Sequence, residues 1–409
     1  MRQEFDVVVV GAGAVGAATA ALLATRGVTA PSRIAVVDAR LPTATQAADW
    51  DLRVFALSHA SQRVLREIGA WERLPRSRVA RYERMCVWDA AGAPGGGGSL
   101  TFDCAELGEP DLGSIVDGAE LKWHCLQAAR HAGVAIVEAG LRDVGVDAER
   151  VRILLNDGRE LGARLIAAAD GAESPSRRFL GIDTAGHPYG QEAIVCHLHT
   201  ERPHRNTAWQ RFLPTGPLAL LPLSDGRSSI VWSVRVDEAR RLRALDPAAF
   251  ARAVDAASDG VLGATRLSTP IASHPLRLRY AQAYVGERAA LLGDAAHVVH
   301  PLAGQGLNLG FLDGAALAVV LADASDAGSF GDLRVLRRYE RWRKSENMPA
   351  AAAFDGLDRL FSNSDPLAGA LRRAGLGLVG RSPLLRRWLA APALGRGAAP
   401  TADRSSRRR

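Results

Sequence analysis

A glycine-rich turn near the start of the chain restricts the fold more than any other feature of the sequence. Residues 11–16, GAGAVG, fit the pattern GxGxxG between a Val-rich run that predicts a buried strand and a small-residue run, 14–27, that predicts a helix. Gly11 permits the tight turn, Gly13 lets the backbone approach a pyrophosphate, and Gly16 allows close packing of helix on strand. Asp38 ends the next predicted strand, where a carboxylate accepts hydrogen bonds from ribose hydroxyls. The alternative is glycine packing alone, but the complete βαβ context favours dinucleotide binding.

Composition and cysteine spacing indicate an ordinary globular chain. Of 409 residues, 47% are hydrophobic and 23% are charged. The four cysteines are scattered without a CxxC pair, which predicts neither a metal site nor a disulfide framework. The uncharged run 7–24 follows acidic residues and precedes Arg26, so a strand, turn and helix account for it better than a signal peptide or a membrane span. We therefore expect a cytoplasmic protein.

The net charge of +7 is concentrated in the C-terminal tail. Residues 366–409 hold ten arginines and one acid, a charge of +9, so residues 1–365 carry 7 − 9 = −2. A nucleic-acid binder would spread its basic face over the folded domain, and we expect no nucleic-acid partner. Leucines and Trp388 among the arginines are typical of an interfacial amphipathic helix. Two interpretations remain: peripheral contact of 366–409 with the inner face of a membrane, which we favour, or a helix packed on the body with a basic end.

The patterning divides the chain into segments. Residues 1–180 and 283–345 alternate predicted strands and helices, whereas 206–213, 217–223 and 228–235 alternate apolar and polar residues, as antiparallel strands do. We expect a nucleotide-binding domain in two parts, 1–180 and 283–345, interrupted by a substrate-binding antiparallel sheet domain at 181–282. A C-terminal helical region with the basic tail, 346–409, follows.

Two further carboxylates follow predicted buried strands. Asp170-Gly171 closes the run 165–170, and Gly293-Asp294 follows the run 289–292. A carboxylate at a strand end can bind the ribityl hydroxyls of a flavin. The glycines after Asp294 let a helix begin with its amides facing the isoalloxazine, whose reduced form carries negative charge. These motifs favour FAD over NAD.

At this point the chain resembles the group A FAD-dependent aromatic monooxygenases and, within them, the ubiquinone-biosynthesis hydroxylase family (UbiH/UbiF/VisC-like). The resemblance rests on GAGAVG at 11–16, DLRVFALSHASQRVL at 51–65, ADGAESPSRR at 169–178 and GDAAHVVHPLAGQGLNLGFLDG at 293–314. It implies an α/β fold with a Rossmann-like FAD-binding domain of the glutathione-reductase type, an inserted, mainly antiparallel sheet, and C-terminal helices. It also implies that Arg53 holds the pyrophosphate, that Asp294 holds the ribityl chain, and that Pro301 lies near the oxygen-reacting face of the flavin.

The expected site residues follow from these motifs and from the resemblance. His300 and Pro301 are the catalytic candidates, with His300 either bonding the substrate or orienting its loop. Lys122 stands where the family usually has Gln, and it either reaches a phosphate or is solvated. The expected cofactor-binding residues are Gly11, Gly13, Gly16, Asp38, Arg53, Lys122, Asp170, Gly171, Gly293, Asp294, Pro301, Gly304, Gln305, Gly306, Leu307 and Asn308.

The predicted sheet carries four large apolar residues, Trp209, Phe212, Leu220 and Trp232. They either line a pocket for an isoprenoid-bearing ring or form the core of the sheet, which is the more frequent outcome.

The resemblance implies hydroxylation of a polyprenyl phenol or benzoquinol in ubiquinone biosynthesis. NAD(P)H reduces FAD, O₂ gives a flavin C4a-hydroperoxide, and its distal oxygen passes to the ring. The implied partners are the polyprenylated substrate and a ubiquinone-biosynthesis complex. The alternatives are a hydroxylase of a small soluble aromatic compound, a non-catalytic flavoprotein scaffold, and a plain NAD dehydrogenase.

Overall fold

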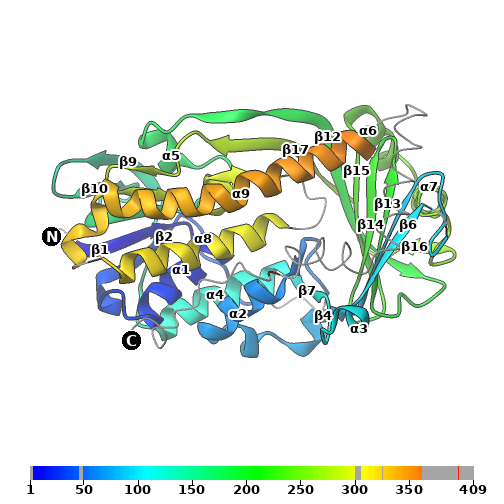
Figure 1. Cartoon of the computed structure of the whole chain (residues 1–409), viewed down its shortest axis with the longest axis horizontal. Coiled ribbons are helices and arrows are strands. Elements are labelled where there is room, and N and C mark those ends of the chain that lie inside the picture. Colours follow the sequence, from blue (N-terminus) through cyan, green and yellow to red (C-terminus); the bar gives the residue numbers. More distant parts are fainter. Residues whose placement is uncertain are drawn as a thin grey trace.

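The computed structural model describes residues 3–45, 49–96, 98–299, 305–324, 326–361 and 395, with only the backbone described at 305, 350–355 and 357–361 (Figure 1). These residues form an α/β unit at the N-terminal end of Figure 1 and a large, mainly antiparallel sheet at the opposite end. This arrangement confirms the predicted fold class.

The α/β unit is built on a sheet with strand order β18-β19-β11-β1-β2-β8, in which the neighbours from β19 to β8 are parallel. Val7–Val10 of β1 are buried on both faces because β1 lies at the centre of this parallel set. The turn Asn156-Asp157-Gly158 joins β10 to β11. The strands are β1 (Gln3–Val10), β2 (Ile34–Asp38), β8 (Ala135–Glu138), β9 (Leu141–Val146), β10 (Val151–Leu155), β11 (Glu160–Ala168), β18 (Val285–Gly286) and β19 (Ala289–Leu291).

Helices cover one face of this sheet, and the β9–β10 hairpin packs against the other (Figure 1). Helix α1 contacts α8 closely, because a Cβ at Gly310 would lie 2.6 Å from Val15 and one at Gly314 would lie 2.2 Å from Thr19. The helices of this unit are α1 (Ala14–Thr25), α2 (His59–Glu67), α4 (Gly118–His131), α5 (Pro175–Phe179), α8 (Gln305–Ala322) and α9 (Leu333–Phe361). Short 3₁₀ turns are η1 (Pro31–Arg33), η2 (Trp71–Arg73), η3 (Arg76–Arg78), η4 (Gly293–Ala295) and η6 (Ala327–Gly331).

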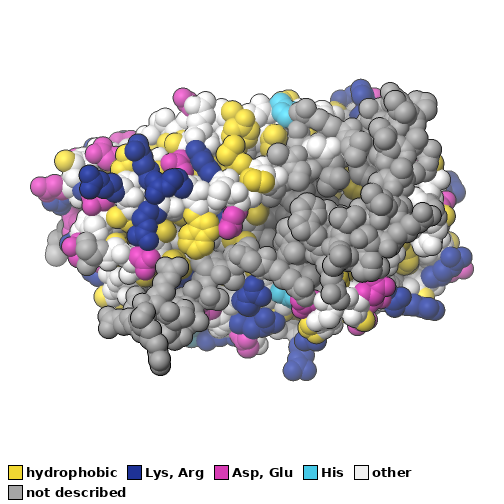
Figure 2. Space-filling model, viewed as in Figure 1, with side chains coloured by type: hydrophobic (Ala, Val, Ile, Leu, Met, Phe, Trp, Pro, Cys, Tyr) yellow, Lys and Arg dark blue, Asp and Glu magenta, His cyan; other side chains and the backbone are white. Residues whose placement is uncertain are grey.

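Helix α9 buries one stripe and exposes the rest. Leu336, Tyr339, Arg343 and Asn347 are buried at spacings of three and four residues, the period of a helix that packs one face on a core. Its outer face carries basic side chains interspersed with acids (Figure 2). Beyond α9 one residue is described: Gly395 lies on α2, where its carbonyl accepts a hydrogen bond of 3.2 Å from Arg63.

The second sheet has nine strands in the order β20-β17-β12-β15-β14-β13-β5-β6, with β16 paired to β12. Helices α6 (Val236–Arg243) and α7 (Pro247–Ala257) cover one of its faces. Its strands are β5 (Arg84–Asp89), β6 (Ser99–Asp103), β12 (Thr184–Thr200), β13 (Thr207–Leu213), β14 (Gly216–Pro222), β15 (Ser228–Arg235), β16 (Thr265–Leu267), β17 (Ala272–Ala281) and β20 (His297–Val298).

The second sheet draws strands from outside the expected segment. β5 and β6 come from residues 84–103, inside the segment 1–180, and β5 pairs in parallel with β13. A small sheet of order β3-β7-β4 is made of strands on both sides of them in the chain: β3 (Val54–Leu57) and β4 (Val79–Tyr82) come before β5, and β7 (Gly113–Asp117) comes after α3 (Cys104–Leu107), which follows β6. The domain boundaries at residues 180, 282 and 345 stay a prediction. The structure adds that β5 and β6, which come from the first segment, belong to the second sheet.

The long strands β12 and β17 connect the two large sheets (Figure 1). Thr184–Pro188 pair with 277–281, and 192–195 pair with 272–275. Between these two stretches the register shifts, because residues 189–191 of β12 stand opposite Leu276 alone. Such a β-bulge bends a strand pair and redirects its side chains.

Membrane-spanning potential can be judged for the described helices. None of them, from α1 to α9, is both long enough and apolar enough to cross a bilayer. The tail 366–409 lies outside the described residues except for Gly395.

Candidate active site

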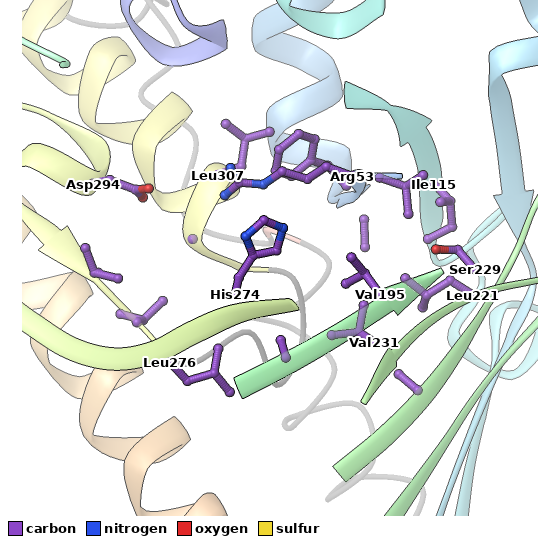
Figure 3. A pocket seen from close by; sticks show the side chains of 18 of the residues that line it. Arg53, Ile115, Val195, Leu221, Ser229, Val231, His274, Leu276, Asp294 and Leu307 are labelled. Atoms are coloured by element: carbon purple, nitrogen blue, oxygen red, sulfur yellow. The ribbon is translucent and has the colours of Figure 1, made fainter. Parts of the chain in front are cut away.

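A cavity of about 510 Å³ lies where the carboxyl ends of the parallel strands meet the second sheet. Gly13, Ala169 and Leu292 border it at strand ends, the position where open α/β sheets bind ligands. Figure 3 shows Asp294, Leu307 and Arg53 on one side of the cavity and Val195 and Val231 of the second sheet on another. The cavity is therefore shared by the nucleotide-binding motifs and the antiparallel sheet.

The glycines of the first turn are required by close contacts. A Cβ at Gly11, whose φ is +106°, would lie 2.4 Å from the Ala169 carbonyl oxygen, and one at Gly16 would lie 2.0 Å from the Gly11 oxygen. At Gly13 a Cβ would meet nothing within 4 Å, so space is open beside the start of α1. No side chain caps α1, and its first N–H groups are available to phosphate oxygens.

Asp38, at the end of β2, hydrogen-bonds to the glycine-rich turn that follows β1. Its Oδ2 accepts a hydrogen bond of 2.7 Å from the Ala12 N–H, and its Oδ1 accepts one of 2.9 Å from Arg40 N–H. The carboxylate thus fixes the turn at the end of β2, beside the turn that would hold the pyrophosphate. Its remaining lone pairs can accept from a ribose.

Arg53 and Lys122 both line the cavity, as expected of residues that meet a phosphate. The segment that carries Arg53 is held by α4, since Gly118 N–H donates to the Arg53 carbonyl at 3.0 Å and Asp117 accepts from Asp51 N–H at 2.8 Å. A Cβ at Gly118 would lie 2.3 Å from the Arg53 oxygen. Glycine at 118 is therefore fixed by this close approach.

Asp294 lines the cavity at the end of β19, within the field of Arg53 and His297. Burial raises the pKa of its carboxyl, and the fields of His297 and Arg53 offset only part of this effect. Among the described residues, none donates a hydrogen bond to this carboxylate. A ligand with hydroxyl groups can therefore satisfy it.

A buried network holds the turn that carries Asp294. Oδ2 of Asp313 accepts from Gly293 N–H at 2.9 Å and bonds Nε2 of His297 at 2.6 Å. Its Oδ1 accepts from Arg343 Nε at 2.7 Å and from Asn347 Nδ2 at 3.1 Å. Burial alone would raise the pKa of Asp313, but His297 and Arg343 outweigh it and hold this pKa well below its usual range. His297 is therefore a member of this buried network.

Asp170 and Gly171 lie differently from each other. The Asp170 carboxylate turns toward α5, accepting from Ser174 Oγ at 2.5 Å and Ser176 N–H at 2.9 Å. Gly171, with a φ of +83°, lines the cavity. Asp170 therefore shapes its own turn, and the glycine after it borders the ligand space.

The loop before α8 is only partly described. Gly306 and Leu307 line the cavity. Asn308 is buried and ties α8 to α2, accepting from Ser58 N–H at 3.0 Å and from Ser61 Oγ at 2.6 Å. His300, Pro301 and Gly304 lie outside the described residues, as does the side chain of Gln305.

The second sheet presents small side chains to the cavity, and the predicted pocket residues do not line it. Trp209, Leu220 and Trp232 pack with α7 in the core on the opposite face, and Phe212 is buried outside the lining. The other interpretation, that these residues form the core of the sheet, describes where Trp209, Leu220 and Trp232 lie. The lining comes from the alternate positions Ala193, Val195, Ala208, Gln210, Pro217, Ala219, Leu221, Ser229, Val231 and Ser233.

Sequence reasoning missed several lining residues. The signal for the sheet face was present, because strand side chains alternate between faces and the small residues alternate with bulky ones. Tyr82, Met85, His274 and Arg277 also line the cavity, and no local pattern marked them. Figure 3 shows His274 projecting from β17 into the space between Arg53 and Val195.

The site fits an FAD molecule followed by an apolar ligand. An uncapped helix start, an open space at Gly13 and the Arg53 guanidinium suit a pyrophosphate. Asp294 suits the ribityl hydroxyls, and the small-residue sheet face leaves room beyond them. Among the described residues, no His, Cys, Asp and Glu cluster could hold a metal ion.

Comparison with known proteins gives consistent matches over nearly the whole chain. A family model described as an FAD binding domain matches residues 4–348. The ubiquinone hydroxylase UbiL of Rhodospirillum rubrum is 36% identical over 393 residues, which cover 95% of this chain and 89% of that protein. The 3-demethoxyubiquinol 3-hydroxylase of Escherichia coli is 33% identical over 402 residues, 96% of this chain and 99% of that one. The p-nitrophenol 4-monooxygenase PnpA of Pseudomonas putida shares the fold, with a TM-score of 0.78 at 20% identity, covering 97% of this chain and 100% of that chain.

Proposed function

Because the chain belongs to the ubiquinone-biosynthesis hydroxylase family of group A FAD-dependent monooxygenases, we propose that it hydroxylates the aromatic ring of a polyprenyl phenol or benzoquinol intermediate of ubiquinone. The observation that carries the proposal is the continuity of the cavity. It runs from the start of α1, past Asp294, to a sheet face of small side chains. A prenylated ring needs both a flavin end and an apolar end.

The reaction balances with the cofactors of this family. Ring C–H, O₂, NAD(P)H and a proton give ring C–OH, NAD(P)⁺ and water. FAD, when bound, takes electrons from NAD(P)H and supplies to the ring an oxygen atom derived from O₂.

The protein's part is binding, orientation and exclusion of water. We propose that the N–H groups at the start of α1, with Gly11, Gly13, Gly16 and Arg53, hold the pyrophosphate, and that Asp38 holds the ribose of the adenosine. Asp294 would accept hydrogen bonds from the ribityl chain, and Lys122 would add positive charge beside the phosphates. His300 and Pro301 remain our candidates for the flavin face of the loop 300–308.

The sheet face would orient the substrate. Ala219, Val231 and Val195 leave a gap that a bulkier face would fill, and their apolar surface matches an isoprenoid tail. With the tail along these residues, the ring would lie toward Arg53 and Leu307, near the proposed flavin position.

The experiment that tests the function is mass spectrometry of quinone-type lipids from cells that lack this gene. We expect a polyprenyl intermediate that lacks one oxygen to accumulate, and the intact gene to restore the normal profile. The position of the missing oxygen identifies the ring carbon. A normal lipid profile, with turnover of water-soluble phenols by the purified protein, would instead establish a hydroxylase of small soluble aromatic compounds.

We also propose that the basic tail 366–409 brings the protein to the membrane surface that contains its substrate, and to a ubiquinone-biosynthesis complex assembled there. Nine net positive charges among leucines support this proposal. Truncation after Ser364 should reduce binding to anionic liposomes and leave the bound flavin in place. Equal liposome binding by the truncated and full chains would contradict it.

A further inference from the structure

The cavity contains an imidazole to which the proposed function assigns no role. His274 lies on β17 and lines the cavity beside the sheet face. Its ring points toward Arg53 and Leu307, the end at which the substrate ring is proposed to lie (Figure 3). Among the described residues, none forms a hydrogen bond with this imidazole. Its nitrogens are therefore open to a ligand.

The pairing of β17 with β12 places His274 on this face, because His274 stands directly opposite Ala193, which also lines the cavity. In a regular strand, only alternate residues would face the cavity. Because residues 189–191 stand opposite Leu276 alone, the pair of strands bends, and four consecutive residues from His274 to Arg277 border the cavity. Arg277 is held by Glu173 at 2.6 Å, whereas the His274 side chain extends inward.

The other ionisable groups that line the cavity do not suit the removal of a phenol proton. Arg53, Lys122 and Arg277 are cations and accept no proton. Burial raises the pKa of Tyr82 to about 12, so its hydroxyl is protonated at neutral pH. Asp294 lies at the end of β19, where it is assigned to the ribityl chain. Imidazole is the side chain best suited to accept a proton near neutral pH.

We propose that His274 is the general base that accepts the hydroxyl proton of the phenol substrate, an inference that rests on the proposed function. As the O–H bond breaks, its proton passes to an imidazole nitrogen, and its electron pair moves into the ring. The ring carbon then forms its bond to the incoming oxygen atom. Loss of the proton from that carbon restores the aromatic ring, and the imidazolium returns its proton to solvent. O₂ and NAD(P)H remain the oxidant and the reductant.

The test is His274→Gln in the full-length, FAD-loaded protein, with a short-chain prenyl phenol as substrate. Gln can donate and accept hydrogen bonds but cannot take the proton. We expect kcat for hydroxylated product to fall by about 100-fold or more, at unchanged FAD content and unchanged NAD(P)H-dependent flavin reduction. Oxidation of NAD(P)H should then yield hydrogen peroxide in place of product. The matched control is His199→Gln, an exposed histidine of β12 outside the cavity, which should behave as wild type.

A pH series separates a base from a residue that only shapes the cavity. Toward pH 9 the phenol ionises more readily by itself, so the loss of kcat in His274→Gln relative to wild type should become smaller. Both proteins share the ionisable groups that face the cavity from other elements, so their titration cancels in the ratio of the two kcat values. These groups are Arg53, Tyr82, Lys122 and Asp294.

Three results would overturn the inference. Wild-type coupling of NAD(P)H oxidation to product in His274→Gln would exclude a base at 274. A raised KM with unchanged kcat would assign the residue to binding alone. If wild type yields no product from any prenyl phenol, the proposed function fails and this inference fails with it, whereas failure of the variant arm alone leaves that function in place.

Discussion

At the scale of residues, Asp313 shows why a charged group can be buried beside the cofactor site. Its carboxylate is fully buried and receives four hydrogen bonds, two from the turn at 293–297 and two from α9. A buried carboxylate is unfavourable unless it is paired and hydrogen-bonded, and here both conditions are met. Removing one partner leaves the remaining charge uncompensated, which is more harmful than never having formed the pair.

We predict that Arg343→Met lowers the free energy of unfolding by about 3–5 kcal/mol, because it leaves the Asp313 charge without its guanidinium partner. Urea unfolding followed by tryptophan fluorescence measures the change. The control is Arg338→Met, whose ion pair with Asp323 at 3.1 Å is half exposed and should contribute no more than about 1 kcal/mol. Equal effects of the two substitutions would contradict a special role for the buried network.

The same network predicts a sign for the dependence of stability on pH. His297 and Arg343 hold the pKa of folded Asp313 below the value of about 3.9 that an unfolded Asp has. Its contribution is therefore fully present above about pH 4 and is lost as the pH falls through the folded pKa. Unfolding experiments between pH 3 and pH 6, on the order of half a unit apart, should show this loss at the acid end. The dependence should be weaker in Arg343→Met.

At the scale of elements, the start of α1 separates two kinds of glycine. Gly16 is required by the fold, since a Cβ there would lie 2.0 Å from the Gly11 oxygen. Gly13 has a φ of −62° and open space around it, so the fold itself tolerates a side chain. The space at Gly13 is the space that a pyrophosphate would occupy.

We predict that Gly13→Ala folds with wild-type stability but binds FAD about 10-fold to 100-fold more weakly, the effect of losing a charge-assisted hydrogen bond of about 1.5–3 kcal/mol. Gly16→Ala is the matched variant, and it should lower the free energy of unfolding by about 1–3 kcal/mol because α1 must shift from β1. Thermal unfolding and flavin absorbance after gel filtration measure the two effects. Unchanged flavin content in Gly13→Ala would place the pyrophosphate elsewhere.

Most elements could be predicted from the sequence because their signals are local. The run at 14–27 predicts α1, found at Ala14–Thr25, and the alternating segments predict β13, β14 and β15. The pairing of β5 with β13 could not be predicted, since more than a hundred residues separate them and no local pattern specifies a partner. The position of His274 likewise depends on the long-range pairing of β17 with β12, in which it stands opposite Ala193.

At the scale of the whole molecule, the two faces of the second sheet meet different requirements. Trp209 and Trp232 fill the face that α6 and α7 cover, while Ala219 and Val231 leave the other face open to the cavity. The sequence alone identified the sheet but not which face the parallel-sheet unit adjoins. The motif residues Gly13, Arg53 and Asp294 could be predicted because their spacing within each motif is fixed by the ligand.

We predict that Ala219→Phe blocks long substrates selectively. The added ring would extend from β14 into the cavity, between Gln210 and Val231 on the neighbouring strands. Hydroxylation of a long-chain prenyl phenol should fall by about 10-fold or more relative to its unprenylated parent, since about 1.4 kcal/mol of lost tail contact is tenfold. FAD content should not change. Competitive turnover of the two phenols measures the ratio of their hydroxylation rates. The control is Ala148→Phe, which adds the same ring at an exposed turn. Equal losses for both substrates in Ala219→Phe would place the prenyl tail elsewhere.

The anchoring of Asp313 by Arg343 also has a consequence for biosynthesis on the ribosome. The turn at Gly11–Gly16 emerges first, but the turn that carries Asp294 is fastened only after Arg343 has left the exit tunnel. At 5–20 residues per second, that interval is roughly 15–65 s. During it, the Val-rich strand β1 can pair with β2 and β11, while the other half of the flavin site does not yet exist. We therefore expect the nascent chain to complete its flavin site only after Arg343 has emerged, so that a shortage of flavin would affect a chain whose first nucleotide-binding strands have already formed.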